Sequence, residues 1–397
     1  MFRDLSPAHG ALRVTAGFGP YRHLFPRAVR DVYLDTAAEG LPVPETKRAL
    51  AAYHAHKELG TPGRRHFHAV EEEARALTAQ LLGTAPANVC FLPSASDALL
   101  ALLNSLHWRA EDQVIISDLE FPSNVIPWLR LREEGVEVTV VESMDGALRL
   151  DDILRCITAR TKLVSLSLVS YKTGAYLAEV AQLAKRVREA GAILSIDATQ
   201  ALGRCPVAVG DIDFLFSSSF KWLMSTHGVG VTYVSPRLRE RLEPRGIGWY
   251  SVPDCFTGDR FDRYVLKEGA ACLTAGMPNF PALYALRASL RFLIDVGVAA
   301  ISAHLRPLVA RLREGVAATG ACMLTPPHPE HASGIVSFAH SRPAAVRAAL
   351  EQRGIVVWAG DGRVRASVHL YNDENDIDAC VGSLKGLIER APRRGMP

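Results

Sequence analysis

The 397-residue sequence has no long hydrophobic run: no stretch reaches the roughly 18 apolar residues that a membrane-spanning helix requires. Its first residues, MFRDLSPAHG, also have no basic start followed by an apolar segment, which is the pattern of a secretion signal. We therefore expect a cytoplasmic protein with no membrane partner.

Signs of disulfides, metal sites and nucleic-acid binding are scarce as well. The seven cysteines are odd in number and form no CxxC pair, which favours free thiols in a reducing compartment. The histidine pairs His54–His56 and His66–His68 have no acidic or cysteine companion at ligand spacing, so we predict no metal site. The net charge is only +3 and the basic residues are scattered, which gives little support for a nucleic-acid partner.

What the sequence contains is a repeated alternation of strand and helix patterns. Seven short apolar runs, among them DQVIIS and AILSID, are separated by segments of helical period such as AEVAQLAKRVREAG. Such an alternation predicts an α/β fold with a mostly parallel seven-stranded sheet covered by helices. We expect an N-terminal arm over 1–30, a large domain over 31–280, and a C-terminal part over 281–397. This last part should begin with one long helical stretch over about 281–318, which links to a smaller α+β domain.

A carboxylate and an amine follow two of the apolar runs. Asp197 ends AILSID, and Lys221 comes 24 residues later, after DFLFSSSF. Ligands bind outside the carboxyl ends of parallel strands, so we expect both side chains to point into one crevice. A pyridoxal phosphate (PLP) enzyme needs this pair, because the lysine forms a Schiff base with the cofactor aldehyde and the aspartate keeps the ring nitrogen protonated. Taken singly, Lys221 is compatible with a surface lysine and Asp197 with a helix N-cap.

The order of motifs resembles that of the class V aminotransferases of PLP fold type I. The resemblance extends from YLDTAAEGLP at 33–42 to RASVHLYNDENDID at 365–378. This group includes cysteine desulfurases, kynureninase-like enzymes and isopenicillin N epimerase-like enzymes. The resemblance implies the fold type I architecture, PLP as cofactor, an amino-acid substrate, and a homodimer whose active site is completed by the partner subunit.

Contacts to the cofactor ring are implied residue by residue. Lys221 matches the Schiff-base lysine and Asp197 the partner of the pyridine nitrogen. Gln200 matches the hydrogen-bond donor to the ring 3-hydroxyl. Phe121 stands where many relatives stack a histidine on the ring, and a phenylalanine can stack but cannot donate a proton.

Contacts to the cofactor phosphate are implied in the same way. Ala95 and Ser96 begin a helix after a small-residue turn, where backbone N–H groups bind anions. Ser218 matches a phosphate-binding hydroxyl. The family's AGTPN motif, whose threonine reaches the phosphate of the neighbouring subunit, reads AGMPN here, and Met277 cannot donate that hydrogen bond.

Substrate contacts are implied for three residues, and a catalytic role is considered for a fourth, Tyr171. Arg365 matches the arginine of the carboxylate clamp, and a guanidinium can pair bidentately with a carboxylate. Arg64 and His66 lie in a segment that approaches the active site in relatives. Tyr171 replaces an asparagine near the ring, where it either acts as a hydrogen-bond partner or proton relay, or only packs.

The reaction type is open at this point. The segment VVWAGDGRVRAS has no cysteine where cysteine desulfurases carry their nucleophile, which argues against desulfuration. EFPSNVIPW and GIGWYSV look most like the isopenicillin N epimerase-like branch, so we expect a lyase, eliminating or decarboxylating, on a bulky amino acid or cysteine S-conjugate in specialised metabolism such as antibiotic biosynthesis. The alternatives are an aminotransferase, an epimerase, or a non-catalytic PLP-fold binding protein; retention of Lys221 and Asp197 argues against the last.

Overall fold

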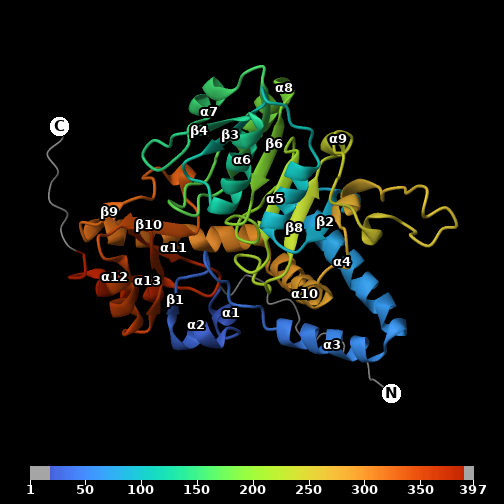
Figure 1. Ribbon diagram of the computed structural model, residues 1–397. Coiled ribbons are helices and arrows are strands. Elements are labelled where there is room, and N and C mark those ends of the chain that lie inside the picture. The colour runs from blue at the N-terminus through green and yellow to red at the C-terminus, as the bar shows by residue number, and fades with distance from the viewer. Residues whose placement is uncertain (1–17, 389–397) are drawn as a thin grey trace.

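A seven-stranded sheet forms the centre of the computed structural model, which describes residues 18–388 (Figure 1). The strand order is β2-β8-β7-β6-β5-β3-β4, and only β8 runs antiparallel to its neighbours. The seven predicted apolar runs are all strands, which confirms the predicted α/β fold. They are β2 (Val89–Leu92), β3 (Gln113–Ser117), β4 (Glu137–Val141), β5 (Thr161–Ser167), β6 (Ile193–Asp197), β7 (Phe214–Ser218) and β8 (Gly230–Val234).

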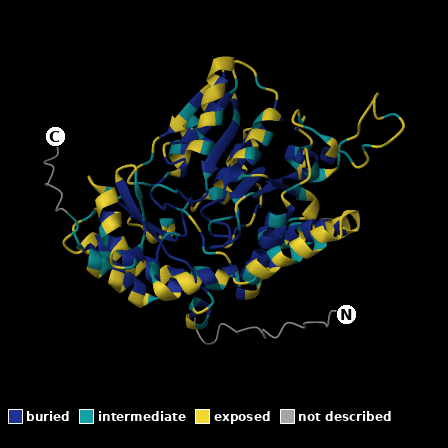
Figure 2. Ribbon diagram, turned by 60° about the horizontal axis from the view of Figure 1, so that its bottom comes forward, coloured by how far each residue is buried: buried dark blue, intermediate teal, exposed yellow. Residues whose placement is uncertain are grey.

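Helices cover both faces of this sheet, because successive side chains of a strand point to opposite sides. Val114 and Ile116 of β3 pack in one core with α5 and α6, whereas Ile115 between them packs in the other core with α4, α7, α8 and α10. The strands are accordingly mostly buried, and β4 at the edge of the sheet is the most exposed of the seven (Figure 2). These helices are α4 (Arg64–Leu82), α5 (Ala95–Asn104), α6 (Ile126–Leu131), α7 (Leu150–Cys156), α8 (Val180–Glu189) and α10 (Phe280–Val296).

A second, smaller sheet lies in the C-terminal part of the chain. It is antiparallel, in the order β12-β13-β10-β9, and a short parallel pair joins β1 near the N-terminus to β11. The strands are β1 (Val32–Tyr33), β9 (Cys322–Met323), β10 (Ile335–Ala339), β11 (Ile355–Val356), β12 (Trp358–Gly360) and β13 (Arg363–Ser367). The other helices are α1 (Gly19–Arg22), α2 (Pro26–Arg30), α3 (Thr46–Glu58), α9 (Pro236–Arg239), α11 (Val298–Ala318), α12 (Pro343–Glu351) and α13 (Glu374–Leu384).

The predicted long helical stretch over 281–318 is in fact two helices. Gly297 has φ +88°, a conformation that side-chain-bearing residues rarely adopt, so α10 ends there and α11 leaves at 73°. No single helix within residues 18–388 is long and apolar enough to cross a membrane; α10 and α11 meet that criterion only as a bent pair. Part of the predicted arm, residues 1–17, lies outside the described residues.

Candidate active site

Asp197 and Lys221 come from the carboxyl ends of two paired strands. Asp197 is the last residue of β6 and is paired in register with Phe216 of β7, and Lys221 follows the end of β7 by three residues. Asp197 is buried and Lys221 is partly buried. The structure therefore brings together the carboxylate and the amine that the sequence predicts to share a crevice.

The two groups stabilise each other's charged form against the effect of burial. Desolvation lowers the pKa of Lys221 to about 8, with Arg365 acting in the same direction and Asp197 opposing it. Desolvation also raises the pKa of Asp197, against hydrogen bonds from Thr199 and the charge of Lys221. A lysine with such a pKa has a large neutral fraction near pH 8, so its amine is available as a nucleophile and a base.

Thr199, which the sequence analysis did not single out, ties these two strand ends together. Its backbone N–H donates to Asp197 Oδ1 over 2.8 Å, and its hydroxyl Oγ1 accepts from the Ser218 N–H over 3.1 Å. These bonds hold the Asp197 carboxylate in one orientation. The position two residues after a strand-ending aspartate is a common place for such a turn, so this role was accessible from the motif.

Gln200 is held at both ends of its side-chain amide. Its Nε2 donates to the Ala37 carbonyl over 3.0 Å, and its Oε1 accepts from the indole N–H of Trp222 over 2.6 Å. Trp222 is fully buried beside Lys221. Since Nε2 carries two protons, one N–H of Gln200 is left for a further acceptor.

The predicted phosphate binders meet at the start of α5. Ser94 caps this helix by accepting from the Asp97 N–H, and Ala95 and Ser96 form its first turn. Gly230 of β8, paired with Ser218 of β7, passes directly beside this turn. A Cβ on Gly230 would lie 2.3 Å from the Ser94 carbonyl oxygen, so only glycine permits this approach.

Phe121 and Tyr171 form an aromatic wall beside Lys221. The Lys221 Nζ lies 5.4 Å from the centroid of the Phe121 ring, and the Phe121 and Tyr171 rings meet edge to face with centroids 5.1 Å apart. Phe121 is 43% exposed, so its ring has a free surface. The Tyr171 carbonyl accepts a hydrogen bond from Arg365 Nη1 over 3.0 Å, which connects this wall to the small sheet.

Arg365 reaches the site from β13 and is buried. Desolvation lowers its pKa to about 10, and the carboxylate of Asp35 opposes that shift. Its guanidinium lies 5.0 Å from the centroid of Trp358, and Arg363, two residues earlier, contacts the same ring. Asp35, Trp358 and Arg363 were missed by the sequence analysis, although the alternating Arg-Val-Arg pattern predicts that both arginines share one strand face.

Arg64 and His66 lie apart from this cluster. Arg64 begins α4 and is exposed, while the His66 ring stacks on His56 with centroids 4.0 Å apart. Neither has a contact with Lys221 or Arg365 among the interactions of the described residues. Their assignment as substrate residues stays a prediction.

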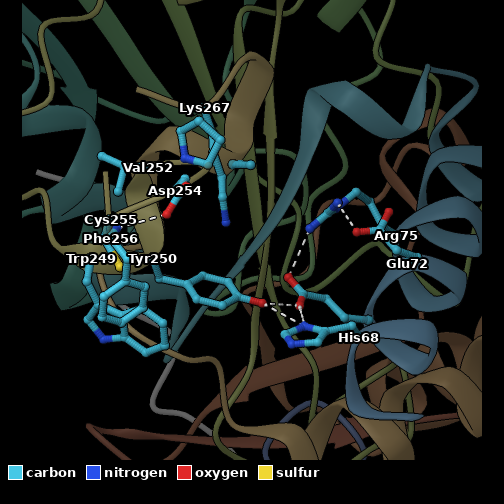
Figure 3. Close-up of a pocket in the computed structure, with 13 residues that line it drawn as sticks. His68, Glu72, Arg75, Trp249, Tyr250, Val252, Asp254, Cys255, Phe256 and Lys267 are labelled. Carbon is cyan, nitrogen blue, oxygen red and sulfur yellow. Dashed lines mark hydrogen bonds and ion pairs between the residues drawn. The ribbon is translucent and has the colours of Figure 1, made fainter. Parts of the chain in front are cut away.

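A cavity of about 470 Å³ opens between α4 and the loop that follows Trp249, at a place none of the predicted site residues line (Figure 3). The Tyr250 hydroxyl donates to the buried Glu71 over 2.6 Å, and the Lys267 Nζ lies 3.9 Å from the Tyr250 ring centroid. Glu71 also accepts from Arg75. The polar groups of this cavity are thus paired with each other, and we place the candidate site at Lys221 instead.

The family model "Aminotransferase class-V" matches residues 32–380. The chain belongs to the class V aminotransferase family. It is therefore a PLP-dependent enzyme that acts on amino acids, as its motifs predict. The Asp197–Lys221 pair and the glycine-lined turn of α5 fit this cofactor, since they offer an acid for the ring nitrogen, an amine for the aldehyde and N–H groups for the phosphate.

Relatives of this class V enzyme cover nearly the whole chain. A "Probable cysteine desulfurase" of Pyrococcus abyssi is 30% identical over 80% of this chain and 83% of its own, and an "Uncharacterized aminotransferase YcbU" of Bacillus subtilis is 27% identical over 92% and 96%. Among solved structures, the cysteine desulfurase of Thermococcus onnurineus is 27% identical with a TM-score of 0.85, covering 92% of this chain and 96% of its own. These relatives do not support our expectation against desulfuration.

Proposed function

We propose that the enzyme is a lyase that eliminates the sulfur substituent from a cysteine S-conjugate, or a related group from a bulky amino acid. The observation that carries this proposal is the tight turn between β12 and β13. Only Asp361 and Gly362 separate the two strands, and no cysteine lies between Val356 and Ser367. No thiol from this segment is available to take a sulfur atom from the substrate, so we expect the sulfur to leave as a free thiol.

Each residue of the site has a role in this proposal. When bound, PLP withdraws electrons from the substrate α carbon. Arg365 holds the α-carboxylate, and the Lys221 Nζ takes the proton from the α carbon. Phe121 has no proton to give, so the departing sulfur receives its proton from Lys221 or from the Tyr171 hydroxyl.

The site also supports proposed contacts to the cofactor. We assign Asp197 to the ring nitrogen and Gln200 to the ring hydroxyl, which agrees with the free N–H left on the Gln200 amide. Phe121 covers the ring. The phosphate is assigned to Ala95, Ser96 and Ser218, whose arrangement around Gly230 supports an anion at the start of α5.

The test is incubation of the holoenzyme with L-cysteine and a panel of S-substituted cysteines, without reductant. Mass spectrometry of the products should give the free thiol with equal amounts of pyruvate and ammonia, and the intact protein should gain no mass. L-Alanine as the product, with the mass of one sulfur atom added to the protein, would contradict the lyase and establish a desulfurase. Cys255, which lines the cavity of Figure 3, is then the first thiol to replace, as Cys255→Ser.

Desulfuration is the second candidate, because a relative named as a probable desulfurase is 30% identical over most of the chain. Transamination and epimerisation are tested by the same product analysis, since the first gives a keto acid with the side chain retained and the second a D-amino acid. Neither has a specific structural observation in its favour.

We also infer a homodimer, which exposed apolar side chains support. The loop after Trp249 extends away from the body of the molecule (Figure 1). This region carries several large apolar side chains that are exposed to water. Such a group of exposed apolar side chains is typical of a protein interface. They include Trp249, Phe256, Phe261, Tyr264 and Val265, with Met277 nearby in sequence.

We also propose a cytoplasmic location, which the seven unpaired cysteines support. The division of the chain into three parts, with boundaries at residues 30 and 280, is likewise a proposal.

A further inference from the structure

Two buried arginines lie side by side on one face of β13. Arg363 and Arg365 are separated by one residue, so their side chains leave the strand in the same direction. Both are almost completely buried, with 1% and 4% of their surface exposed. Trp358 and Gly360 of β12 lie directly opposite Arg365 and Arg363.

The indole of Trp358 brings the two guanidinium groups close together. The Arg363 and Arg365 guanidinium carbons lie 4.9 and 5.0 Å from the centroid of this one ring. The ring has room because its neighbour is glycine: a Cβ on Gly360 would lie 3.1 Å from two atoms of the indole. This stretch of β12 is therefore shaped to hold an aromatic ring against both cations.

Each guanidinium has part of its hydrogen-bonding capacity unused. Arg365 Nη1 donates to the Tyr171 carbonyl, and Arg363 Nη1 forms an ion pair with Asp361. The Nε of each arginine, by contrast, is buried and has no hydrogen-bond partner in the described part of the chain. An arginine presents its Nε and Nη2 protons along one edge, which matches the two oxygens of a carboxylate. Two such edges correspond to two carboxylates.

The charges of the neighbourhood also favour anions. Burial and the proximity of Arg363 both lower the pKa of Arg365, since two buried cations repel each other. Asp35 offsets part of this charge at Arg365. Asp361, the ion-pair partner of Arg363, lies at the surface with 69% of its side chain exposed, which leaves the inner side of Arg363 uncompensated.

Arg363 is within reach of the candidate active site. Its guanidinium carbon lies 5.1 Å from the Tyr171 ring centroid, and Tyr171 contacts Phe121, whose ring is 5.4 Å from the Lys221 Nζ. A substrate whose α carbon lies at Lys221 and whose α-carboxylate lies at Arg365 would extend its side chain along this aromatic wall.

We propose that Arg363 determines specificity by binding a second carboxylate, at the end of the substrate side chain, while Arg365 binds the α-carboxylate. The substrate class is then that of dicarboxylic α-amino acids, and, within the proposed lyase function on which this inference rests, cysteine S-conjugates whose sulfur substituent ends in a carboxylate. Arg363 is thus a specificity-determining residue and takes no part in bond breaking.

The test compares glutarate with butyrate, since neither has an amine that could react with the cofactor. Isothermal titration of the holoenzyme should give tighter binding for glutarate. Arg363→Met should reduce the ratio of the two affinities about tenfold or more, the change expected for about 1.4 kcal/mol. Arg365→Met should weaken both ligands. Arg353→Met, which removes an exposed arginine bonded to the Ser383 carbonyl, is the matched control and should leave the ratio unchanged.

An unchanged ratio in Arg363→Met would overturn the proposal, whether the two affinities stay the same or fall by the same factor. If this variant does not fold, Asp361→Asn decides instead, because it removes the carboxylate that competes for Arg363. Glutarate should then bind several-fold more tightly, and unchanged or weaker binding overturns the proposal. Neither binding measurement requires turnover, so the two proposals can fail separately. If Arg363→Met lowers the ratio of glutarate to butyrate affinity but the wild-type enzyme releases no thiol, only the lyase function is refuted. If the wild-type enzyme turns over S-methyl- and S-carboxymethyl-cysteine equally well and Arg363→Met leaves the ratio unchanged, only the second carboxylate site is refuted.

Discussion

The indole N–H of Trp222, one residue after Lys221, donates to the side-chain oxygen of Gln200 over 2.6 Å. An indole can only donate, so this contact determines which end of the amide faces it. The nitrogen end must then face the Ala37 carbonyl and, in the proposed assignment, the ring hydroxyl of the cofactor. Trp222 is itself fixed, since it is fully buried and stacks on His369 with ring centroids 5.5 Å apart.

The first prediction is that Trp222→Phe weakens cofactor retention. Phenylalanine fills much of the space but gives no hydrogen bond, so the Gln200 amide can turn its oxygen toward the ring hydroxyl. We expect PLP affinity to fall several-fold, for a loss of about 1 kcal/mol, and the pH titration of the bound cofactor's absorbance to shift. Trp108→Phe is the control, because the Trp108 indole donates to the Leu103 carbonyl over 2.9 Å. Unchanged affinity and titration in Trp222→Phe would refute the positioning role.

The sequence predicted what depends on local patterns. The seven strands were recognised from their apolar runs, and Asp197 and Lys221 were paired because the ends of parallel strands meet at one edge of a sheet. What it missed depends on contacts between distant segments. Asp35 comes close to Arg365 because it pairs with Ser367 at the end of β13, and Trp358 lies beside both arginines because β12 pairs with β13. The break at Gly297 was missed because a glycine within an apolar helical pattern need not end the helix.

The second prediction concerns the pH dependence of cofactor attachment. The pKa of Lys221 is lowered to about 8, so its amine is mostly neutral above that pH and mostly charged below it. The rate of covalent attachment of PLP to apoprotein should therefore rise with pH and level off above a midpoint near 8. Borohydride reduction at timed points, followed by intact-protein mass, measures it. Lys221→Ala should remain folded and gain no cofactor mass.

A substitution of Asp197 tests the direction in which the pH midpoint of PLP attachment moves. Its carboxylate raises the pKa of Lys221, so Asp197→Asn should move the midpoint to lower pH. A midpoint that moves to higher pH in this variant, or one near the ordinary lysine value in the wild type, would contradict the electrostatic account of the pair.

The third prediction is that Arg365→Ala raises KM for amino acids far more than it lowers kcat. The arginine is proposed to hold the α-carboxylate in the ground state and the transition state alike, so its loss removes uniform binding. We expect a cost in kcat/KM of about 2 to 4 kcal/mol, as for one partner of a buried charged pair. Arg353→Ala serves as the small-sheet control. A fall in kcat at unchanged KM would instead indicate that Arg365 acts on the bond-breaking step.

The last prediction tests the homodimer through its most exposed aromatic residue. Phe261 is 85% exposed on the loop that follows Trp249, where only a partner protein would remove its ring from water. A charge at the centre of such an interface must be desolvated without a partner, so Phe261→Asp should shift the protein toward monomer at micromolar concentration in light scattering. Met144→Asp is the matched control. Met144 is also exposed, at 50%, but it follows β4, whereas the loop after Trp249 leads into residues 269–273, which contact β2 at the opposite edge of the sheet.

If the partner completes the active site, the Phe261→Asp monomer should also lose turnover, and activity per chain should rise with protein concentration as dimers form. A wild-type protein that scatters as a monomer while fully active with cofactor bound would refute both the homodimer and the shared site, and would leave the exposed loop to a different partner.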